Sequence, residues 1–237
     1  MAISPDHFGT RPPPPPGGPG SEKITLPRTV LVLLGIMVCI MALRQVLPFD
    51  LDEKLLVFLG LALFIGGEFQ WDRLYTLITS VFVHGGWMHL IFNGIWIALL
   101  GGKVQRRVSA KGFLAFFFLT AIFAGLTETF INWGTTTLLI GASGGVFGLI
   151  GAAGHIWAVK PWQTRPERLR TLLAFGALMM ALNLGYAFVG DVPGSDGEAV
   201  SWEAHAGGLV AGLLLFPLFD RYRPAIPEGP DGPDWRQ

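Results

Sequence analysis

The stretch Phe113-Leu-Ala-Phe-Phe-Phe-Leu-Thr-Ala-Ile-Phe-Ala-Gly-Leu-Thr-Glu-Thr-Phe-Ile-Asn132 decides the fold class of this chain. It runs for 20 residues and carries one charged side chain, Glu128. A helix that crosses the hydrocarbon core of a membrane needs about 20 mostly apolar residues, because each residue adds about 1.5 Å to a core about 30 Å thick. The stretch therefore predicts a membrane-spanning helix.

The composition of the whole chain agrees with this prediction. Of 237 residues, 51% are hydrophobic and 14% are charged, and mean hydropathy is +0.50, whereas soluble domains carry about 25% charged residues. The formal net charge of zero and the apolar content exclude a disordered chain, a coiled coil and a nucleic-acid-binding protein. The single cysteine, Cys39, excludes a disulfide framework within the chain and a cysteine-built metal site. We expect no metal and no cofactor.

Six apolar segments are candidates for membrane spans, and they predict an all-α polytopic bundle over residues 27–220. A further apolar stretch, Leu55–Ile65, is too short to cross, so we expect an interfacial or re-entrant helix in the first loop. A Pro/Gly-rich tail, residues 1–26, and a short C-terminal tail, residues 221–237, flank the bundle; the first is a solvated leader or a ligand for a proline-binding module. The six segments are 28–47, 87–102, 113–132, 143–159, 171–190 and 205–219.

The positive charges give the orientation. With six spans, 14 of the 17 basic residues fall on the side that holds both ends of the chain. Lys and Arg gather on the cytoplasmic side of membrane proteins. We therefore expect a multi-pass protein with cytoplasmic N- and C-termini. Because the N-terminal tail lacks organelle-targeting character, we expect it in a bacterial plasma (inner) membrane. The basic residues on this side are Arg11, Lys23, Arg28, Lys103, Arg106, Arg107, Lys111, Lys160, Arg165, Arg168, Arg170, Arg221, Arg223 and Arg236.

Three polar side chains share one depth within the bilayer. Ser143 stands 17 residues above Lys160, His205 stands 15 above Asp220 and His89 stands 14 above Lys103, which places them about 21–26 Å from the cytoplasmic charges. Polar groups inside a membrane are costly and usually face a cavity or a partner. We expect the three groups to line a wet cavity near the outer face, together with the irregular loop 134–142.

The residue types in that cavity are those of nucleophilic catalysis. A serine with a histidine in reach is a nucleophile with its general base, so Ser143 and His205 form a candidate dyad. Ser143 opens a helix, where free backbone N–H groups can stabilise an oxyanion. His89 and Asn93 are four residues apart on one helix face and could donate to the same oxyanion. No carboxylate is expected behind His205, which is why we predict a dyad. Asn183 and Glu128 are interpreted as hydrogen bonders between helices and not as catalytic residues.

These residues resemble the motifs of the rhomboid intramembrane serine proteases, on three spans and in the family's order. The family's His-x4-His-x3-Asn run corresponds to His84-Gly-Gly-Trp-Met-His89-Leu-Ile-Phe-Asn93. Its Gly-x-Ser-Gly motif corresponds to Gly141-Ala-Ser143-Gly144. Its Ala-His-x-x-Gly-x-x-x-Gly motif corresponds to Ala204-His205-Ala-Gly-Gly208-Leu-Val-Ala-Gly212.

The resemblance implies a serine endopeptidase that cuts single-span or polytopic membrane proteins within the lipid bilayer, in or next to their transmembrane segments. It implies that Ser143 is the nucleophile, His205 the base, and His89, Asn93 and the Ser143 backbone the oxyanion site, with Gly141 nearby. It also implies that His84 is a structural residue of the first loop and that Phe147 stacks on His205. The chain departs from the family at the first-loop Trp-Arg pair, whose positions hold Tyr75 and Thr76 here, while Trp71 and Arg73 lie further upstream.

The glycines also have a structural interpretation. Gly144-x-x-x-Gly148 and Gly208-x-x-x-Gly212 are small faces that favour close helix packing. If these faces pack the fourth and sixth spans together, Ser143 comes within reach of His205. The fifth span contains Gly176 and Gly185 and few anchors to its neighbours, so it is our candidate for a lateral gate.

Two other functions remain to be weighed. Gly141-Ala-Ser143-Gly-Gly145 also satisfies the nucleophile elbow of α/β-hydrolases, but that fold needs a parallel sheet that six membrane-length segments do not supply. A channel or transporter would place polar residues across the whole membrane, whereas here they gather near one face, and no inverted repeat is evident.

Overall fold

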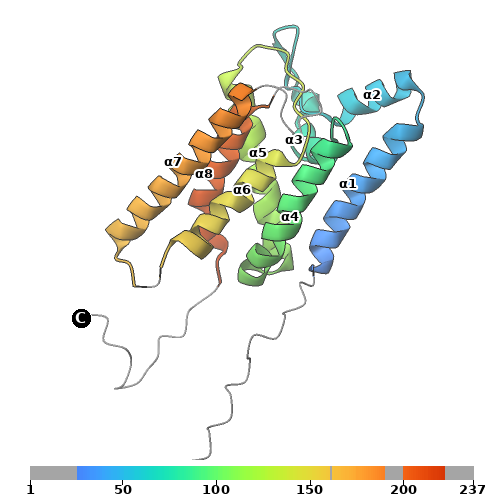
Figure 1. The fold of residues 1–237 in the computed structure, drawn as a ribbon. Coiled ribbons are helices and arrows are strands. Elements are labelled where there is room, and N and C mark those ends of the chain that lie inside the picture. The colour runs from blue at the N-terminus through green and yellow to red at the C-terminus, as the bar shows by residue number, and fades with distance from the viewer. Residues whose placement is uncertain (1–25, 161, 190–199, 222–237) are drawn as a thin grey trace, which may run out of the picture.

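The computed structural model describes residues 26–160, 162–189 and 200–221. The predicted tails, 1–26 and 221–237, therefore lie almost wholly outside the described residues. The described part is helical apart from loops and one two-stranded hairpin (Figure 1). The elements are α1 (Arg28–Val46), α2 (Phe49–Leu59), β1 (Phe64–Ile65), β2 (Glu68–Phe69), η1 (Trp71–Arg73), α3 (Thr76–Thr79), η2 (Ser80–Phe82), α4 (Trp87–Val108), α5 (Ala110–Ile131), α6 (Ser143–Ala153), η3 (Gly154–Ala158), α7 (Arg165–Val189) and α8 (Trp202–Phe219).

Five of these helices are long and apolar enough to cross a membrane: α1, α4, α5, α7 and α8. The remaining predicted span, 143–159, is the shorter helix α6, which continues as the π-helical turn η3. Helix α6 lies at the centre of the bundle, against α4, α5 and α8 (Figure 1). The all-α polytopic fold is confirmed. A parallel sheet is not found in the described residues, which excludes the α/β-hydrolase fold there.

The prediction that the second segment is short was wrong. Helix α4 continues past residue 102 to Val108, because Gln105, Arg106 and Arg107 are good helix formers that favour a helix in spite of their polarity. The sixth segment also begins earlier than predicted. Helix α8 starts at Trp202, and Ser201 caps it by accepting a hydrogen bond from the Ala204 N–H at 3.2 Å.

The first loop contains a helix, but not over Leu55–Ile65 as predicted. Helix α2 begins at Phe49, because Pro48 precedes it and Asp50 and Asp52 in its first turn favour a helix N-terminus. It ends at Gly60, whose backbone is extended, and the last predicted residues form strand β1. The guanidinium of Arg73 then ties this loop together by donating to the carbonyls of Val57, Gly60 and Ala62.

Glycines let α6 and α8 touch backbone to backbone. A Cβ on Gly208 would clash with the carbonyl oxygen of Gly144, which is too close for any side chain. A Cβ on Gly212 would clash in the same way with the carbonyl oxygen of Gly148. The two pairs are four residues apart on each helix, so the contact runs along one face of both. The predicted packing of these small faces is what the structure has. It brings the first turns of α6 and α8 side by side.

Hydrogen bonds between chain segments define one end of the bundle. At this end, Thr29 of α1 accepts from Gln105 of α4 at 3.3 Å, and Arg107 of α4 pairs with Asp220. The start of α1 and the end of α8 thus lie at the same end (Figure 1). The other end holds the first loop and the first turns of α4, α6 and α8, which surround the site described next.

Candidate active site

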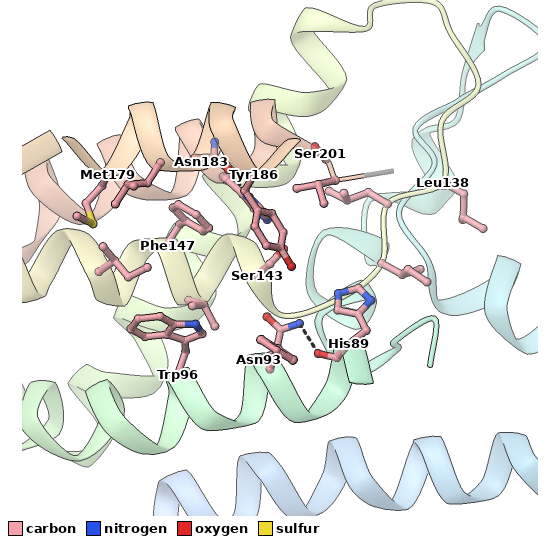
Figure 2. A pocket seen from close by; sticks show the side chains of 18 residues that line it. His89, Asn93, Trp96, Leu138, Ser143, Phe147, Met179, Asn183, Tyr186 and Ser201 are labelled. Atoms are coloured by element: carbon pink, nitrogen blue, oxygen red, sulfur yellow. Dashed lines mark hydrogen bonds between the residues drawn. The ribbon is translucent and has the colours of Figure 1, made fainter. Parts of the chain in front are cut away.

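A cavity of about 780 Å³ opens between α4, α6, α7 and α8, and Ser143 and His205 both line it. The two residues are 62 positions apart in the sequence, and the packing of α6 on α8 brings them to one site. Figure 2 shows Ser143 facing the space between α4 and α7. The other lining residues are His89, Phe92, Asn93, Trp96, Leu138, Leu139, Ile140, Val146, Phe147, Ile150, Met179, Leu182, Asn183, Tyr186, Val200 and Ser201.

Ser143 is the first residue of α6 and follows Gly141 by two positions. Gly141 has φ of +105°, a conformation that residues with a Cβ rarely adopt. Its N–H donates to the Ser80 carbonyl at 3.0 Å, which ties the loop before α6 to the first loop. The N–H groups of the first turn of α6 have no carbonyl acceptor within the helix. Ser143 therefore stands where a helix N-terminus favours negative charge.

His205 lies in the first turn of α8 and is 8% exposed. The ring of Phe147, one turn beyond Ser143 on α6, lies parallel to the His205 ring, with centroids 4.2 Å apart and planes 13° apart. This is the contact that the family resemblance implies for Phe147. The stack fixes the plane of the imidazole, so His205 can only present its edges to the cavity and to α7.

One of those edges contacts Asn183 of α7. The His205 Nδ1 and the Asn183 Oδ1 are 2.7 Å apart, and both side chains are buried. The Asn183 Nδ2 donates to the carbonyl of Trp202 at 3.1 Å, so the amide oxygen is the atom that faces the ring. The sequence interpretation of Asn183 as a hydrogen bonder between helices missed that its partner is the candidate base. The sequence marks Asn183 as a strongly polar residue inside an apolar span, but it does not show which group this residue meets.

His89 and Asn93 lie on one face of α4 and point into the cavity opposite α7 (Figure 2). The Asn93 Nδ2 donates one of its hydrogens to the His89 carbonyl at 3.0 Å. The His89 ring packs against Gly141, where a Cβ would lie 2.6 Å from the Nε2. The Gly85 N–H donates to the His89 Nδ1 at 3.4 Å, which leaves the proton of a neutral ring on Nε2, the nitrogen beside Gly141.

His84 lies in the loop between η2 and α4 and is 1% exposed. Its Nε2 accepts a hydrogen bond from the Ala142 N–H at 3.4 Å, and its carbonyl accepts one from Arg44. Burial, reinforced by the neighbouring His89, lowers the pKa of His84 to about 3. His84 is therefore neutral and holds the residue before Ser143, which fits the structural role that the resemblance implies.

Two other predicted polar residues lie outside the cavity lining. His155 in η3 contacts the Leu213 carbonyl at 2.7 Å and packs on Phe216, in the half of the bundle away from the cavity. Glu128 of α5 is buried and accepts hydrogen bonds from Asn132 at 3.0 Å and from Ser201. Glu128 thus holds the residue that caps α8, four positions before His205.

Comparisons with known proteins show which family the chain belongs to. The family model described as "Rhomboid domain" matches residues 71–221, which include η1 to α8 and every residue of the candidate site. A protein called Rhomboid-like protease 3, from Toxoplasma gondii, is 25% identical over 214 residues, which cover 90% of this chain and 75% of that protein.

Bacterial relatives match a shorter part. Proteins called Rhomboid protease GlpG, from Yersinia pestis and Yersinia pseudotuberculosis, are 30% identical over 152 residues, which cover 62% of this chain and 48% of theirs. The chain thus spans about half the length of these relatives. Since the family model covers well over half of the chain and the candidate site lies within the matched residues, this multi-pass membrane protein belongs to the rhomboid family.

Proposed function

We propose that this protein is an intramembrane serine endopeptidase with a Ser143–His205 dyad. The observation that carries the proposal is the position of these two side chains, from distant parts of the chain, on one cavity at the first turns of two contacting helices. Family membership supports the same activity, because the relatives named above are called proteases. No cofactor takes part in the proposed reaction.

In the proposed reaction the Ser143 Oγ attacks the scissile carbonyl carbon, and His205 takes the Ser143 proton. The tetrahedral intermediate carries its negative charge on the former carbonyl oxygen. His205 then gives the proton to the leaving amine, which departs as the new N-terminus. A water molecule cleaves the acyl-enzyme by the same two steps, releases the carboxylic acid and restores Ser143.

The oxyanion is held, in this proposal, by the Ser143 backbone N–H, the His89 Nε2–H and a hydrogen of the Asn93 amide. His89 and Asn93 line the cavity from the helix opposite α7, on the same side as the start of α6 (Figure 2). Gly141 has no side chain, so the His89 ring can pack against the backbone two residues before Ser143. Donors fixed in a site with little water stabilise developing charge without having to reorient during the reaction.

The proposed substrates are transmembrane segments of single-span or polytopic membrane proteins. A helix hides its carbonyls in internal hydrogen bonds, so a substrate segment must unwind before Ser143 can reach one. Residues that weaken helices, such as Gly, Ser and Pro, should favour cleavage. We further propose that both chain ends of this protein are cytoplasmic, in the plasma (inner) membrane of a bacterium, and that the cavity opens near the outer face.

The test is cleavage of a single-span model substrate by the purified protein in liposomes. Wild type is expected to produce two fragments whose junction lies in or beside the transmembrane segment. Ser143→Ala and His205→Ala are expected to produce none while remaining folded, which a cooperative thermal unfolding transition would verify. Equal cleavage by wild type and Ser143→Ala would refute the proposal.

A further inference from the structure

We propose that Asn183 is a positioning residue of the catalytic site, which holds His205 in the tautomer that carries its proton on Nδ1. The inference rests on the proposed function of the Ser143–His205 dyad. In this proposal α7 contributes Asn183 as a third residue of the site, in contact with the base His205.

Asn183 differs from the other residues of α7 in its burial. Of the described side chains in this helix, only Asn183 is buried, with 3% of its surface exposed. A helix that faces lipid normally anchors itself by apolar or small residues. Here the one buried anchor is a polar amide, whose two ends bond to α8, at the His205 ring and at the Trp202 carbonyl. Losing α7 from this position would leave the amide and the ring unpaired.

The geometry of the amide fixes which nitrogen of His205 can act as a base. Because Nδ2 donates to the Trp202 carbonyl, Oδ1 is the atom that faces the imidazole, 2.7 Å from Nδ1. An amide oxygen only accepts hydrogen bonds, so Nδ1 must be the donor and must carry the ring proton. Nε2 is then unprotonated and able to take the proton of Ser143. The Phe147 stack fixes the ring plane, and Asn183 fixes the rotation within that plane.

Catalysis strengthens this contact. When His205 takes the Ser143 proton, the ring becomes a cation, and a hydrogen bond from a cation is stronger than one from a neutral ring. Asn183 therefore favours the transition state over the resting state, which is the requirement for a rate effect. The ionisable groups around this corner of the cavity are His89 of α4, Glu128 of α5 and Tyr186 of α7. All three stay unchanged in the variants below.

Two substitutions distinguish a residue that orients His205 from one that only attaches α7 to α8. Asn183→Leu has a similar volume and removes both hydrogen bonds. Asn183→Asp keeps an oxygen acceptor for His205 but removes the donor to Trp202. We expect Asn183→Leu to lower kcat about 10- to 100-fold with little change in KM. We expect Asn183→Asp to recover most of that loss and to move the acid limb of its pH–rate profile to higher pH, because a carboxylate stabilises the imidazolium.

An anchoring role alone predicts no difference in kcat between the two variants. Asn183→Asp loses the Trp202 bond as Asn183→Leu does, so the two variants would then be impaired alike. That result, or wild-type kcat in Asn183→Leu, would overturn the proposal. Leu178→Ala, on an exposed part of the same helix, is the matched control and should keep the wild-type rate within about twofold.

A measurement independent of catalysis tests the same contact if the enzyme shows no turnover. In protein labelled with ¹⁵N-histidine, the His205 signals are identified by their loss in His205→Gln. We expect the proton of neutral His205 on Nδ1 in wild type and a mixture of tautomers in Asn183→Leu. A proton on Nε2 in wild type would overturn the role of Asn183. If wild type does not cleave the substrate but carries the His205 proton on Nδ1, only the proposed function is refuted.

Discussion

Gly208 of α8 lies against the backbone carbonyl of Gly144 of α6, with no room for a Cβ between the two helices. Gly144 directly follows Ser143, and Gly208 lies three residues after His205. A very close contact between two helices therefore lies beside the candidate dyad. The same close packing of α6 on α8 brings Ser143 and His205 to one cavity.

This contact predicts the effect of adding a side chain. Gly208→Val should lower the free energy of unfolding by about 3 kcal/mol or more and abolish cleavage, since the added atoms meet backbone that cannot rotate away. Thermal unfolding in mild detergent measures the first effect. Gly35→Ala is the control: a Cβ at Gly35 meets nothing within 4 Å, so this variant should be as stable as wild type or more so. An unchanged melting temperature for Gly208→Val would contradict the packing.

The oxyanion site makes a separate prediction. Asn93→Ala removes one proposed donor and should lower kcat by about 100-fold with a smaller change in KM, because the oxyanion exists only along the reaction path. His89→Ala should behave similarly. Both variants should still react with a fluorophosphonate at Ser143, more slowly than wild type. A rise in KM with unchanged kcat would show instead that these residues only bind the substrate.

Much of the bundle was predictable because the physical demand of the membrane is strong. Long apolar runs can satisfy their backbone only as helices, so five spans and their order follow directly from the sequence. Where the helices end did not follow, because apolarity stops at residue 102 while helix formation continues to Val108. Likewise, the start of α2 depends on Pro48 and two aspartates and not on hydrophobicity.

The candidate site was predictable to different degrees. Ser143, His205, His89 and Asn93 stand out because each is a polar group in an apolar span, and the structure brings all four to one cavity. The partner of His205 could not be found in this way. Which of several polar residues meets the imidazole depends on the rotation of α7 about its axis, and the weak amphipathic pattern of that helix leaves this rotation open.

The buried His84 predicts a dependence of stability on pH. Its pKa is about 3 in the folded protein and about 6.5 in an unfolded chain. The unfolded state therefore binds more protons between these values, and folding stability falls as pH drops from about 6.5 towards 3. At pH 5 the loss should be roughly 2 kcal/mol. Above pH 6.5 this contribution is complete.

Melting temperatures between pH 5 and pH 7.5 check this prediction. His84→Asn removes the titrating ring, so its melting temperature should start lower but vary less over the same range. Equal pH dependence in wild type and His84→Asn would mean that other groups, such as the carboxylates, cause the whole effect.

The sparse packing of α7 predicts that this helix must move for a substrate to enter. Trp96 of α4 and Met179 of α7 line the cavity from opposite sides (Figure 2). With Cys39 first replaced by serine, cysteines at these two positions joined by a short bifunctional reagent should block cleavage of a membrane-embedded substrate. Reduction of a cleavable reagent should restore it. Undiminished turnover by the crosslinked protein would exclude α7 as the gate.

Labelling by a fluorophosphonate, followed by mass spectrometry of the modified peptide, tests the dyad most directly. The predicted result is a single adduct on Ser143 in wild type, absent from Ser143→Ala and strongly reduced in His205→Ala. Labelling that persists in Ser143→Ala, or an adduct on another residue, would contradict the assignment of Ser143 as the nucleophile.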